Sequence, residues 1–407
     1  MKNYETERYK KYKILFEKKL SNYKQSETKL FIKNILIRTV GILGTISRKL
    51  SKRKKVDVLF LLNSEQTHKR IKPIINYVNN ELTVEVSIRN NIISNIKKFR
   101  LGMVPFNIPI ELIADYSEAK YYSEIYEPKI IVMIENESLL SSYLKNLTDA
   151  KTINVAHGVR TNLIEHSNID YDYYLIFGKS SLKHLKNNPY LFGTTTPIIT
   201  GSPFLGAYKI DKKINHERKN IIYLAQYENS RVRDHLHFSN EIFIKFAKRN
   251  PNKPCIIKPH PLDDNQTWKM RTKGIKNVAI LNKESNILNA INSAYVSVIA
   301  WSNAALESAL IECPIIAIDR SGLANNNLDI SDYFPVVKDV IEFENALLDI
   351  EKNHEKYKEV CKRFVDYHLG NIENSQKKIA ETIVGIFNNT CVHLETITSN
   401  KNNSKFI

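Results

Sequence analysis

Short, continuously apolar segments recur along this chain in two series, and this pattern constrains its fold more than any other feature. The first series includes VDVLFLL (56–62), KIIVMI (129–134) and YYLIF (173–177), with helix-length stretches between the segments. Segments that are apolar throughout, rather than at alternate positions, are typical of parallel strands covered by helices on both faces. The sequence therefore predicts an open α/β sheet from residue 56 onward.

A second series of the same kind follows a polar, charged segment at 209–220. Its strands are predicted at 220–225, 254–258, 277–281, 295–300 and 314–318. Two successive series of similar size predict two doubly wound, Rossmann-like domains facing one another across a cleft. We place these domains at 56–208 and 218–390. Helices occupy the C-terminal end of the second domain, and 391–407 forms a flexible tail.

The N-terminal segment 1–55 carries most of the net charge of +17. Its most apolar part, 31–46, is interrupted by Lys33 and Arg38 and is shorter than the roughly 20 residues of a bilayer span. The segment is therefore predicted to be a basic amphipathic helical arm that lies on an anionic membrane surface. The alternative is that the arm packs on the protein's own second domain. Nucleic acid is not an expected partner, because no basic motif interleaved with aromatic residues is present.

Cysteine usage and the N-terminus indicate a cytoplasmic setting. The four cysteines contain no CxxC pair, so neither a zinc site nor a disulfide framework is implied. The first residues lack the order of a basic region, an apolar run and a small-residue cleavage site that marks a signal peptide. With the basic arm, these features predict a protein attached peripherally to the inner face of the plasma membrane.

One candidate phosphate site is KPHP (258–261), at the end of a predicted strand. The chain contains neither GxxxxGK[ST] nor GxGxxG, so an anionic ligand must be held by helix N-termini, hydroxyl groups and cations such as Lys258. The carboxyl ends of strands face the ligand crevice in open α/β sheets. His260, fixed between two prolines, could there donate a hydrogen bond or a positive charge to a leaving phosphate. A histidine that only caps the strand end is equally consistent with the spacing.

A second candidate is the strand, turn and helix from 297 to 319. Ser302 or Asn303 is predicted to cap the helix, whose first turn offers free N–H groups to a phosphate. Glu307 lies four residues after Asn303, on the same helical face, and could accept hydrogen bonds from ribose hydroxyls. The alternative is an ordinary capped helix with a surface glutamate.

The first predicted domain offers His157, which ends the strand at 151–156 and precedes Gly158. A neutral histidine at that edge could act as the general base for an acceptor hydroxyl, although a buried core histidine would give the same pattern. Asp170 and Asp172 match the DxD pattern of metal-dependent transferases. They precede their strand instead of following it, so we expect no metal and no cofactor.

These motifs, in this order, resemble those of bacterial capsule and teichoic-acid transferases of GT-B fold. The family includes enzymes like the CDP-glycerol glycerophosphotransferases and the capsule Kdo or sialic acid transferases. The resemblance rests on His157-Gly158, Gly178, the GSP turn at 201–203, KPHP, and the serine-turn helix with Glu307, and it covers about residues 56 to 318.

The resemblance implies a metal-independent transferase that moves a unit from a nucleotide-activated donor to a surface polysaccharide: capsule, teichoic acid or lipooligosaccharide. It implies that His260, Ser302 and Asn303 bind the donor phosphate and that His157 acts on the acceptor side. Gln226, after the first strand of the second domain, is assigned to the donor nucleotide and is closer to the capsule group. The donor therefore stays open between CMP-linked, CDP-linked and other nucleotide sugars. Alternatives are a nucleotide-sugar epimerase or hydrolase of the same fold, or a non-catalytic polysaccharide-binding protein.

Overall fold

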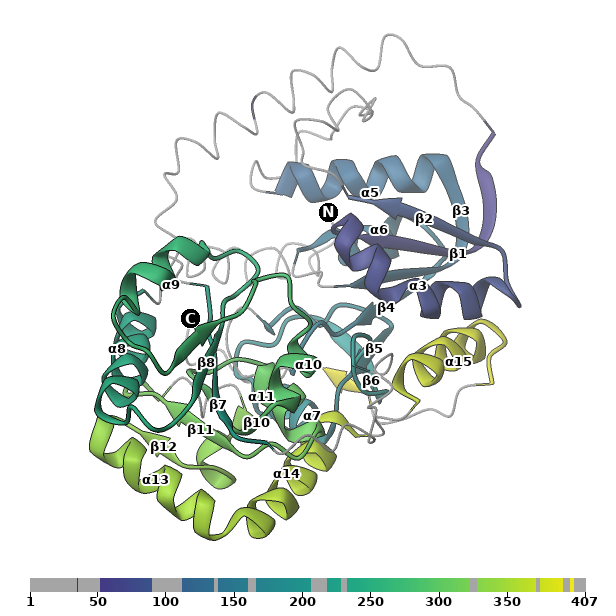
Figure 1. Cartoon of the computed structure of the whole chain (residues 1–407). Helices are drawn as coiled ribbons and strands as arrows, with labels where there is room; N and C mark the ends of the chain where they lie inside the picture. The colour runs from purple at the N-terminus through teal and green to yellow at the C-terminus, as the bar shows by residue number, and fades with distance from the viewer. Residues whose placement is uncertain are drawn as a thin grey trace. The chain divides into compact units, whose positions relative to one another are not determined.

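A computed structural model describes residues 35, 52–89, 112–134, 138–159, 166–205, 218–227, 233–322, 328–370, 374–390 and 396–398 (Figure 1). They form two compact units. Unit 1 holds the described residues up to Phe177, those of 181–205, and those from 374 onward; unit 2 holds Gly178–Ser180 and the described residues of 218–370. The predicted arm over 1–55 lies outside the described residues, apart from residues 35 and 52–55. So does most of the predicted tail.

Unit 1 is built on a seven-stranded sheet with the order β13-β6-β5-β4-β3-β1-β2. The strands are β1 (Lys54–Leu62), β2 (Val84–Ile88), β3 (Tyr126–Ile134), β4 (Lys151–Val155), β5 (Tyr173–Ile176), β6 (Thr194–Ile199) and β13 (Ile397–Thr398). All neighbouring strands are parallel except β13 and β6. The prediction of a parallel α/β sheet is confirmed, and β13 adds an antiparallel edge strand that was not predicted.

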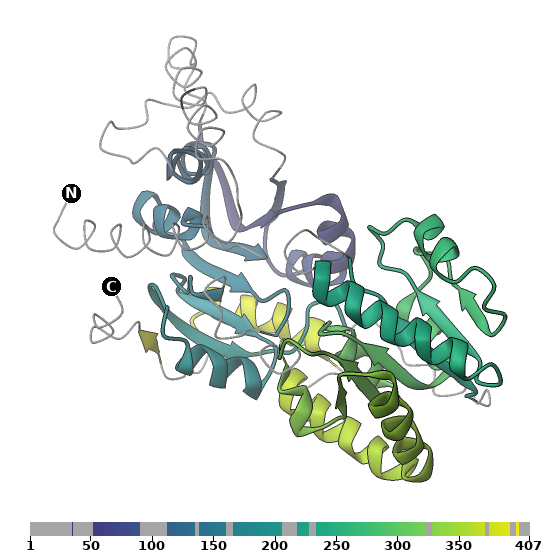
Figure 2. The ribbon, with the colours of Figure 1, turned by 90° about the vertical axis from the view of Figure 1, so that its left-hand side faces the viewer.

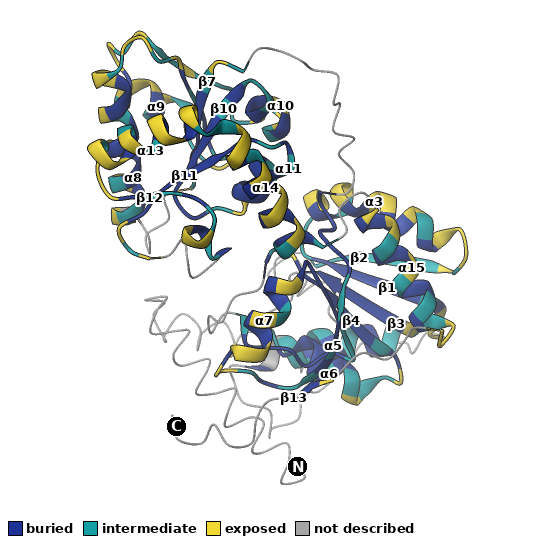
Figure 3. Ribbon diagram, turned by 90° about the horizontal axis from the view of Figure 1, so that it is seen from below, coloured by how far each residue is buried: buried dark blue, intermediate teal, exposed yellow. Residues whose placement is uncertain are grey.

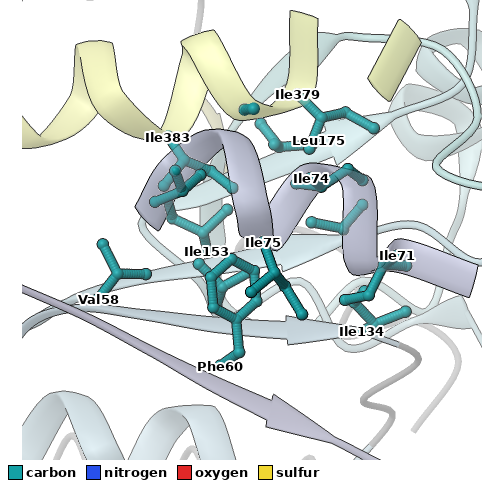
Figure 4. Close-up of a cluster of buried hydrophobic side chains, with 14 of the residues drawn as sticks. Val58, Phe60, Ile71, Ile74, Ile75, Ile134, Ile153, Leu175, Ile379 and Ile383 are labelled. Carbon is teal, nitrogen blue, oxygen red and sulfur yellow. The ribbon is translucent and has the colours of Figure 1, made fainter. Parts of the chain in front are cut away.

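Helices cover both faces of this sheet. One face packs against α3 (Glu65–Asn79) and α15 (Ser375–Phe387), the other against α5 (Ile113–Ile125) and α6 (Leu140–Leu147). In Figure 4, Ile71 and Ile74 of α3 lie between α15 and the strand residues Phe60 and Ile153. These side chains are nearly inaccessible to solvent, and burial of apolar surface of this kind is the dominant favourable term in folding.

Helix α15 corrects the predicted domain boundary. The second domain was predicted to run to residue 390, whereas residues 374–390 belong to unit 1. The cause is the apolar stripe of α15: Ile379, Ile383 and Ile386 pack in the same buried cluster as α3. The chain therefore leaves unit 1, builds unit 2, and returns to complete the core of unit 1.

Unit 2 contains a six-stranded, wholly parallel sheet with the order β12-β11-β10-β7-β8-β9. Its strands are β7 (Asn220–Leu224), β8 (Cys255–Lys258), β9 (Val278–Ile280), β10 (Ala294–Ile299), β11 (Ile315–Ile318) and β12 (Val336–Val337). The strands of both sheets are largely buried (Figure 3). All five strands predicted here are present, so the prediction of two doubly wound units is confirmed.

The helices of unit 2 fall into two groups, in which α8 packs on α13 and α11 on α14 (Figures 1 and 2). The helices are α8 (Arg233–Arg249), α9 (Asn265–Arg271), α10 (Ile287–Asn292), α11 (Ala304–Leu310), α13 (Val340–Lys352) and α14 (His354–Leu369). Helix α7 (Lys179–Asn187) begins in unit 2 and belongs to unit 1 from residue 181 onward. None of the helices in the described part of the chain is long and apolar enough to cross a membrane.

The strand order fixes where a ligand crevice can form. In unit 2, β8 and β9 lie on one side of β7, and the chain then crosses to β10 on the other side. The order reverses in the same way between β1 and β3 in unit 1. Ligands of doubly wound sheets bind at the carboxyl ends of the strands at such reversals. A ligand site is therefore expected at the residues that follow β7 and β10.

Candidate functional site at the carboxyl edge of the unit 2 sheet

The reversal point of unit 2 is spanned by a hydrogen bond from one strand end to the other. The backbone N–H of Trp301, just beyond β10, donates to Oε1 of Gln226, just beyond β7, over 3.0 Å. Gln226 was predicted to contact the donor. Its carbonyl oxygen instead holds the two strand ends together, which leaves only its amide NH₂ to donate to a ligand.

His260 follows β8 on the turn that the two prolines predict, and its ring is held in one tautomer. Nδ1 accepts a hydrogen bond from the backbone N–H of Leu262 over 3.2 Å. A backbone N–H can only donate, so Nδ1 carries the lone pair and the ring hydrogen is on Nε2. Nε2 makes no hydrogen bond to the described residues. A neutral His260 thus presents one N–H donor to a ligand.

The turn that carries His260 is organised by Asp263. One carboxylate oxygen, Oδ2, accepts from the backbone N–H of His260 over 3.3 Å and from Nε1 of Trp268 over 3.2 Å. Trp268 is buried, with its ring 6.0 Å from that of Tyr223. A fixed carboxylate, a buried indole and two prolines therefore preorganise the histidine.

Electrostatics favour the neutral form of this histidine. Partial burial lowers the pKa of His260 below its ordinary value, and the positive charge of Lys258 lowers it further, while Asp263 opposes them. Protonation would also break the bond from Leu262. Of the two roles considered from the sequence, a hydrogen-bond donor fits this environment and a fixed positive charge does not.

Lys258 has a different environment from the one predicted. Its side chain is only 6% exposed, and Nζ donates to the carbonyl oxygens of Pro259 over 2.8 Å and Lys283 over 2.7 Å. Burial lowers the pKa of this lysine. The ammonium group therefore joins the ends of β8 and β9, which favours a positioning role over direct contact with a phosphate.

The serine-turn helix is α11, and the structure distinguishes its two predicted caps. Oγ of Ser302 accepts from the backbone N–H of Ala304 over 3.1 Å, whereas Asn303 is exposed and caps no N–H with its side chain. Glu307 lies in the first turn, half-buried, as its spacing predicts. Ser302 thus satisfies one helix N–H itself, and Asn303 is the more accessible of the two to a ligand.

The sequence reasoning missed Arg320, which follows β11 at the same sheet edge. Its guanidinium carbon lies 4.4 Å from the centre of the Phe238 ring on α8, and its side chain is exposed. No carboxylate of the described residues pairs with it. The preceding Asp319 is occupied locally, because its Oδ1 accepts from the N–H and Oγ of Ser321. The available signal was an arginine two residues beyond the end of a wholly apolar strand.

His157 lies in unit 1, directly beyond β4, and its side chain is exposed. Its ring centre is 5.3 Å from that of Phe204, which follows β6. Exposure at the carboxyl edge disfavours the alternative of a buried core histidine. The other predicted site residues belong to unit 2, so His157 forms a separate candidate site within unit 1.

The DxD residues have structural partners in unit 1. Asp170 accepts from Ser142 and lies 3.6 Å from Nζ of Lys145, while Asp172 lies 3.3 Å from the same nitrogen and accepts from the backbone N–H of Thr152 over 2.7 Å. Within the described ranges, no three His, Cys, Asp or Glu side chains are grouped to hold a metal ion. The two aspartates therefore stabilise the entry to β5.

Comparison with known proteins places the chain in a fold class. No protein-family model and no curated protein sequence matches it. Solved structures do match it. One is the Staphylococcus aureus MnaA–UDP complex, which matches with a TM-score of 0.55 and 11% identity, and the match covers 83% of this chain and 98% of that chain. A putative UDP-N-acetylglucosamine 2-epimerase from Listeria monocytogenes matches with a TM-score of 0.56, 11% identity, and 86% and 100% covered.

A wall teichoic acid polymerase, TagF, is similar to the same extent. A histidine variant of it with CDPG matches with a TM-score of 0.54, 14% identity, and 91% of this chain and 98% of that chain covered. These likenesses, with two doubly wound units, show that the chain has the GT-B fold. At such identities they show the fold alone.

Proposed function

We propose that this chain is a metal-independent GT-B transferase that takes a unit from a nucleotide-activated donor, CMP- or CDP-linked, and passes it to a bacterial surface polysaccharide. The observation that carries the proposal is His260. Leu262 fixes its ring in one neutral tautomer, Asp263 holds the turn that carries it, and its Nε2–H can donate at the edge where GT-B ligands bind. A preorganised donor of this kind stabilises charge that develops on a leaving phosphate.

In this mechanism the two units divide the chemistry. The bond between the transferred unit and the nucleotide phosphate breaks, and the negative charge that appears on that phosphate is stabilised by the Nε2–H of His260. The guanidinium of Arg320 lies beyond β11, which β10 and β7 separate from β8, and would contact another part of the nucleotide. Asn303 and Glu307 lie beside the same edge and would contact the rest of the nucleotide. His157 would take the proton from the acceptor hydroxyl as it attacks.

A thermal-shift screen tests the donor half of this proposal. CMP, CDP, UDP and GDP would each be added at increasing concentration, with inorganic phosphate as a control for non-specific anion binding. A nucleotide at about 100 times its dissociation constant stabilises the folded state by ~2.7 kcal/mol. We expect a cytidine nucleotide to raise the melting temperature. If no nucleotide shifts it beyond the effect of phosphate, the proposal is wrong.

A nucleotide-sugar 2-epimerase is the second candidate, because the epimerase structures match this chain as well as the polymerase does. An epimerase consumes its donor without an acceptor, whereas a transferase needs one. Donor consumption measured with and without added polysaccharide therefore separates the two. We place the enzyme at the cytoplasmic face of the plasma membrane through residues 1–55, which salt-dependent binding to anionic vesicles would test.

A further inference from the structure

An exposed arginine lies on an aromatic ring next to His157, at the carboxyl edge of the unit 1 sheet. The guanidinium carbon of Arg70, on α3, is 3.9 Å from the centre of the Phe204 ring. The same ring is 5.3 Å from the ring of His157. A cation and a candidate base thus contact the same phenyl ring. They come from elements far apart in the sequence: α3, the end of β4 and the turn after β6.

The ring on which they meet is firmly held. Phe204 is 7% exposed, and its backbone N–H donates to Oγ of Ser202 over 3.2 Å. The carbonyl of Ser202 accepts from Oγ of Ser375 over 2.8 Å, and the next carbonyl along the turn accepts from Nε2 of Gln376 over 2.7 Å. Helix α15 therefore fixes the turn that carries the ring. Preorganisation of this kind reduces the entropy that binding would otherwise cost.

The charge of Arg70 is available to a ligand. No carboxylate of the described residues forms an ion pair with it. Glu65, on the same helix, lies 3.7 Å from a ring nitrogen of His68 and is about 140° away from Arg70 around the helix axis. Stacking uses the face of the guanidinium and leaves its in-plane N–H groups able to bind two oxygens of an anion.

We infer that Arg70, Phe204 and His157 form an anion subsite that binds a phosphate or carboxylate group of the acceptor beside the hydroxyl that reacts. The inference rests on the proposed function and specifies its acceptor as an anionic polymer. Arg70 would hold the anionic group while His157 contacts the neighbouring hydroxyl. A neutral polysaccharide would lack the group that Arg70 recognises.

Binding of three oligomers of equal length to the whole chain tests this inference. The probes are a fluorescent poly(glycerol phosphate), an oligouronate, and a neutral glucose oligomer. We expect one of the anionic probes to bind and the neutral probe to bind at least tenfold more weakly. Arg70→Gln should lower the affinity for that anionic probe by about 10- to 100-fold, which is the effect of losing one charge-assisted hydrogen bond. Which anionic probe binds distinguishes a phosphate from a carboxylate acceptor.

Lys72→Ala is the matched control, because Lys72 is exposed on the same helix and carries the same charge without contacting Phe204. It should change binding less than twofold. Arg70→Lys keeps the charge and loses the planar fork of the guanidinium. Its loss of affinity should be smaller than that of Arg70→Gln and larger than that of Lys72→Ala. Equal losses in Arg70→Gln and Lys72→Ala, equal binding of all three probes, or no binding of either anionic probe would each overturn the inference.

Nucleotide affinity of the same variants keeps this inference distinct from the proposed function. Arg70→Gln should leave cytidine nucleotide binding within twofold of the parent, because the nucleotide is assigned to unit 2. Nucleotide binding without Arg70-dependent anion binding would overturn the subsite alone. Anion binding without nucleotide binding would overturn the transferase proposal and leave the subsite standing.

Discussion

The most informative single change is His260→Ala. The structure assigns this residue one N–H donor, from Nε2, because Nδ1 accepts from Leu262. A hydrogen bond from it to a charged phosphate would contribute about 1.5 to 3 kcal/mol, so its loss should weaken nucleotide binding by roughly 10- to 100-fold. His260→Gln places an amide NH₂ close to the position of Nε2 and should recover part of the affinity. His157→Ala, in unit 1, should leave nucleotide affinity within twofold.

Calorimetric titration of CMP, CDP and UDP into the three variants and the parent measures these differences directly. Circular dichroism confirms that each variant is folded. His157→Ala should instead lower turnover by about 10² to 10⁴, the usual contribution of a positioned general base. Unchanged affinity in a folded His260→Ala protein would refute the reasoning. So would an equal loss of nucleotide binding in His157→Ala.

Three further predictions follow from other parts of the structure. Arg320→Ala should weaken nucleotide binding by about 10- to 100-fold in the same titration, whereas Lys248→Ala, exposed at the other end of α8, should not. Burial raises the pKa of Asp115 to about 6, and the nearby Glu118 adds to this while the charge of Arg89 opposes it. The free energy of unfolding of the parent therefore falls as the pH rises from about 4 to 6, because Asp115 ionises more readily in the unfolded chain. In urea unfolding, Asp115→Asn should therefore gain stability over the parent across that window, by at most about 3 kcal/mol, and a gain independent of pH would contradict this. Turnover should survive EDTA, and loss of activity restored by Mg²⁺ would return attention to Asp170 and Asp172.

The strands could be predicted because their apolar runs report burial on both faces, a local property of the sequence. The position of α15 could not be predicted in this way. Its stripe of Ile379, Ile383 and Ile386 is suited to either sheet, and only the packing against α3 decides between them. The predicted domain boundary was wrong at that point, because the amphipathicity of a helix indicates that one face is buried and does not indicate what it packs against.

The candidate site, too, could be predicted from the sequence only in part. The prolines and the strand end were enough to place His260 on a stiff turn. Its tautomer depends on the contact with Leu262, and the shape of its turn depends on Asp263; no spacing rule specifies either contact. Lys258 was predicted to contact phosphate from its type and place alone. The carbonyl of Lys283, contributed by the loop after β9, directs its ammonium inward. Arg320 was missed because its stacking partner, Phe238, lies on a helix much earlier in the chain.

The central claim, acceptor-dependent transfer from a nucleotide-activated donor, is tested most directly by nucleotide release. The chain would be incubated with CDP-glycerol and, in parallel, with CMP- and UDP-linked sugars, each with and without poly(glycerol phosphate) or a capsule-type oligosaccharide, and the freed nucleotide quantified by chromatography. We predict release from one donor that requires an acceptor, persists in EDTA and is lost in His157→Ala. Conversion of a donor to its epimer or hydrolysis product without any acceptor, or no consumption of any donor, would contradict the account.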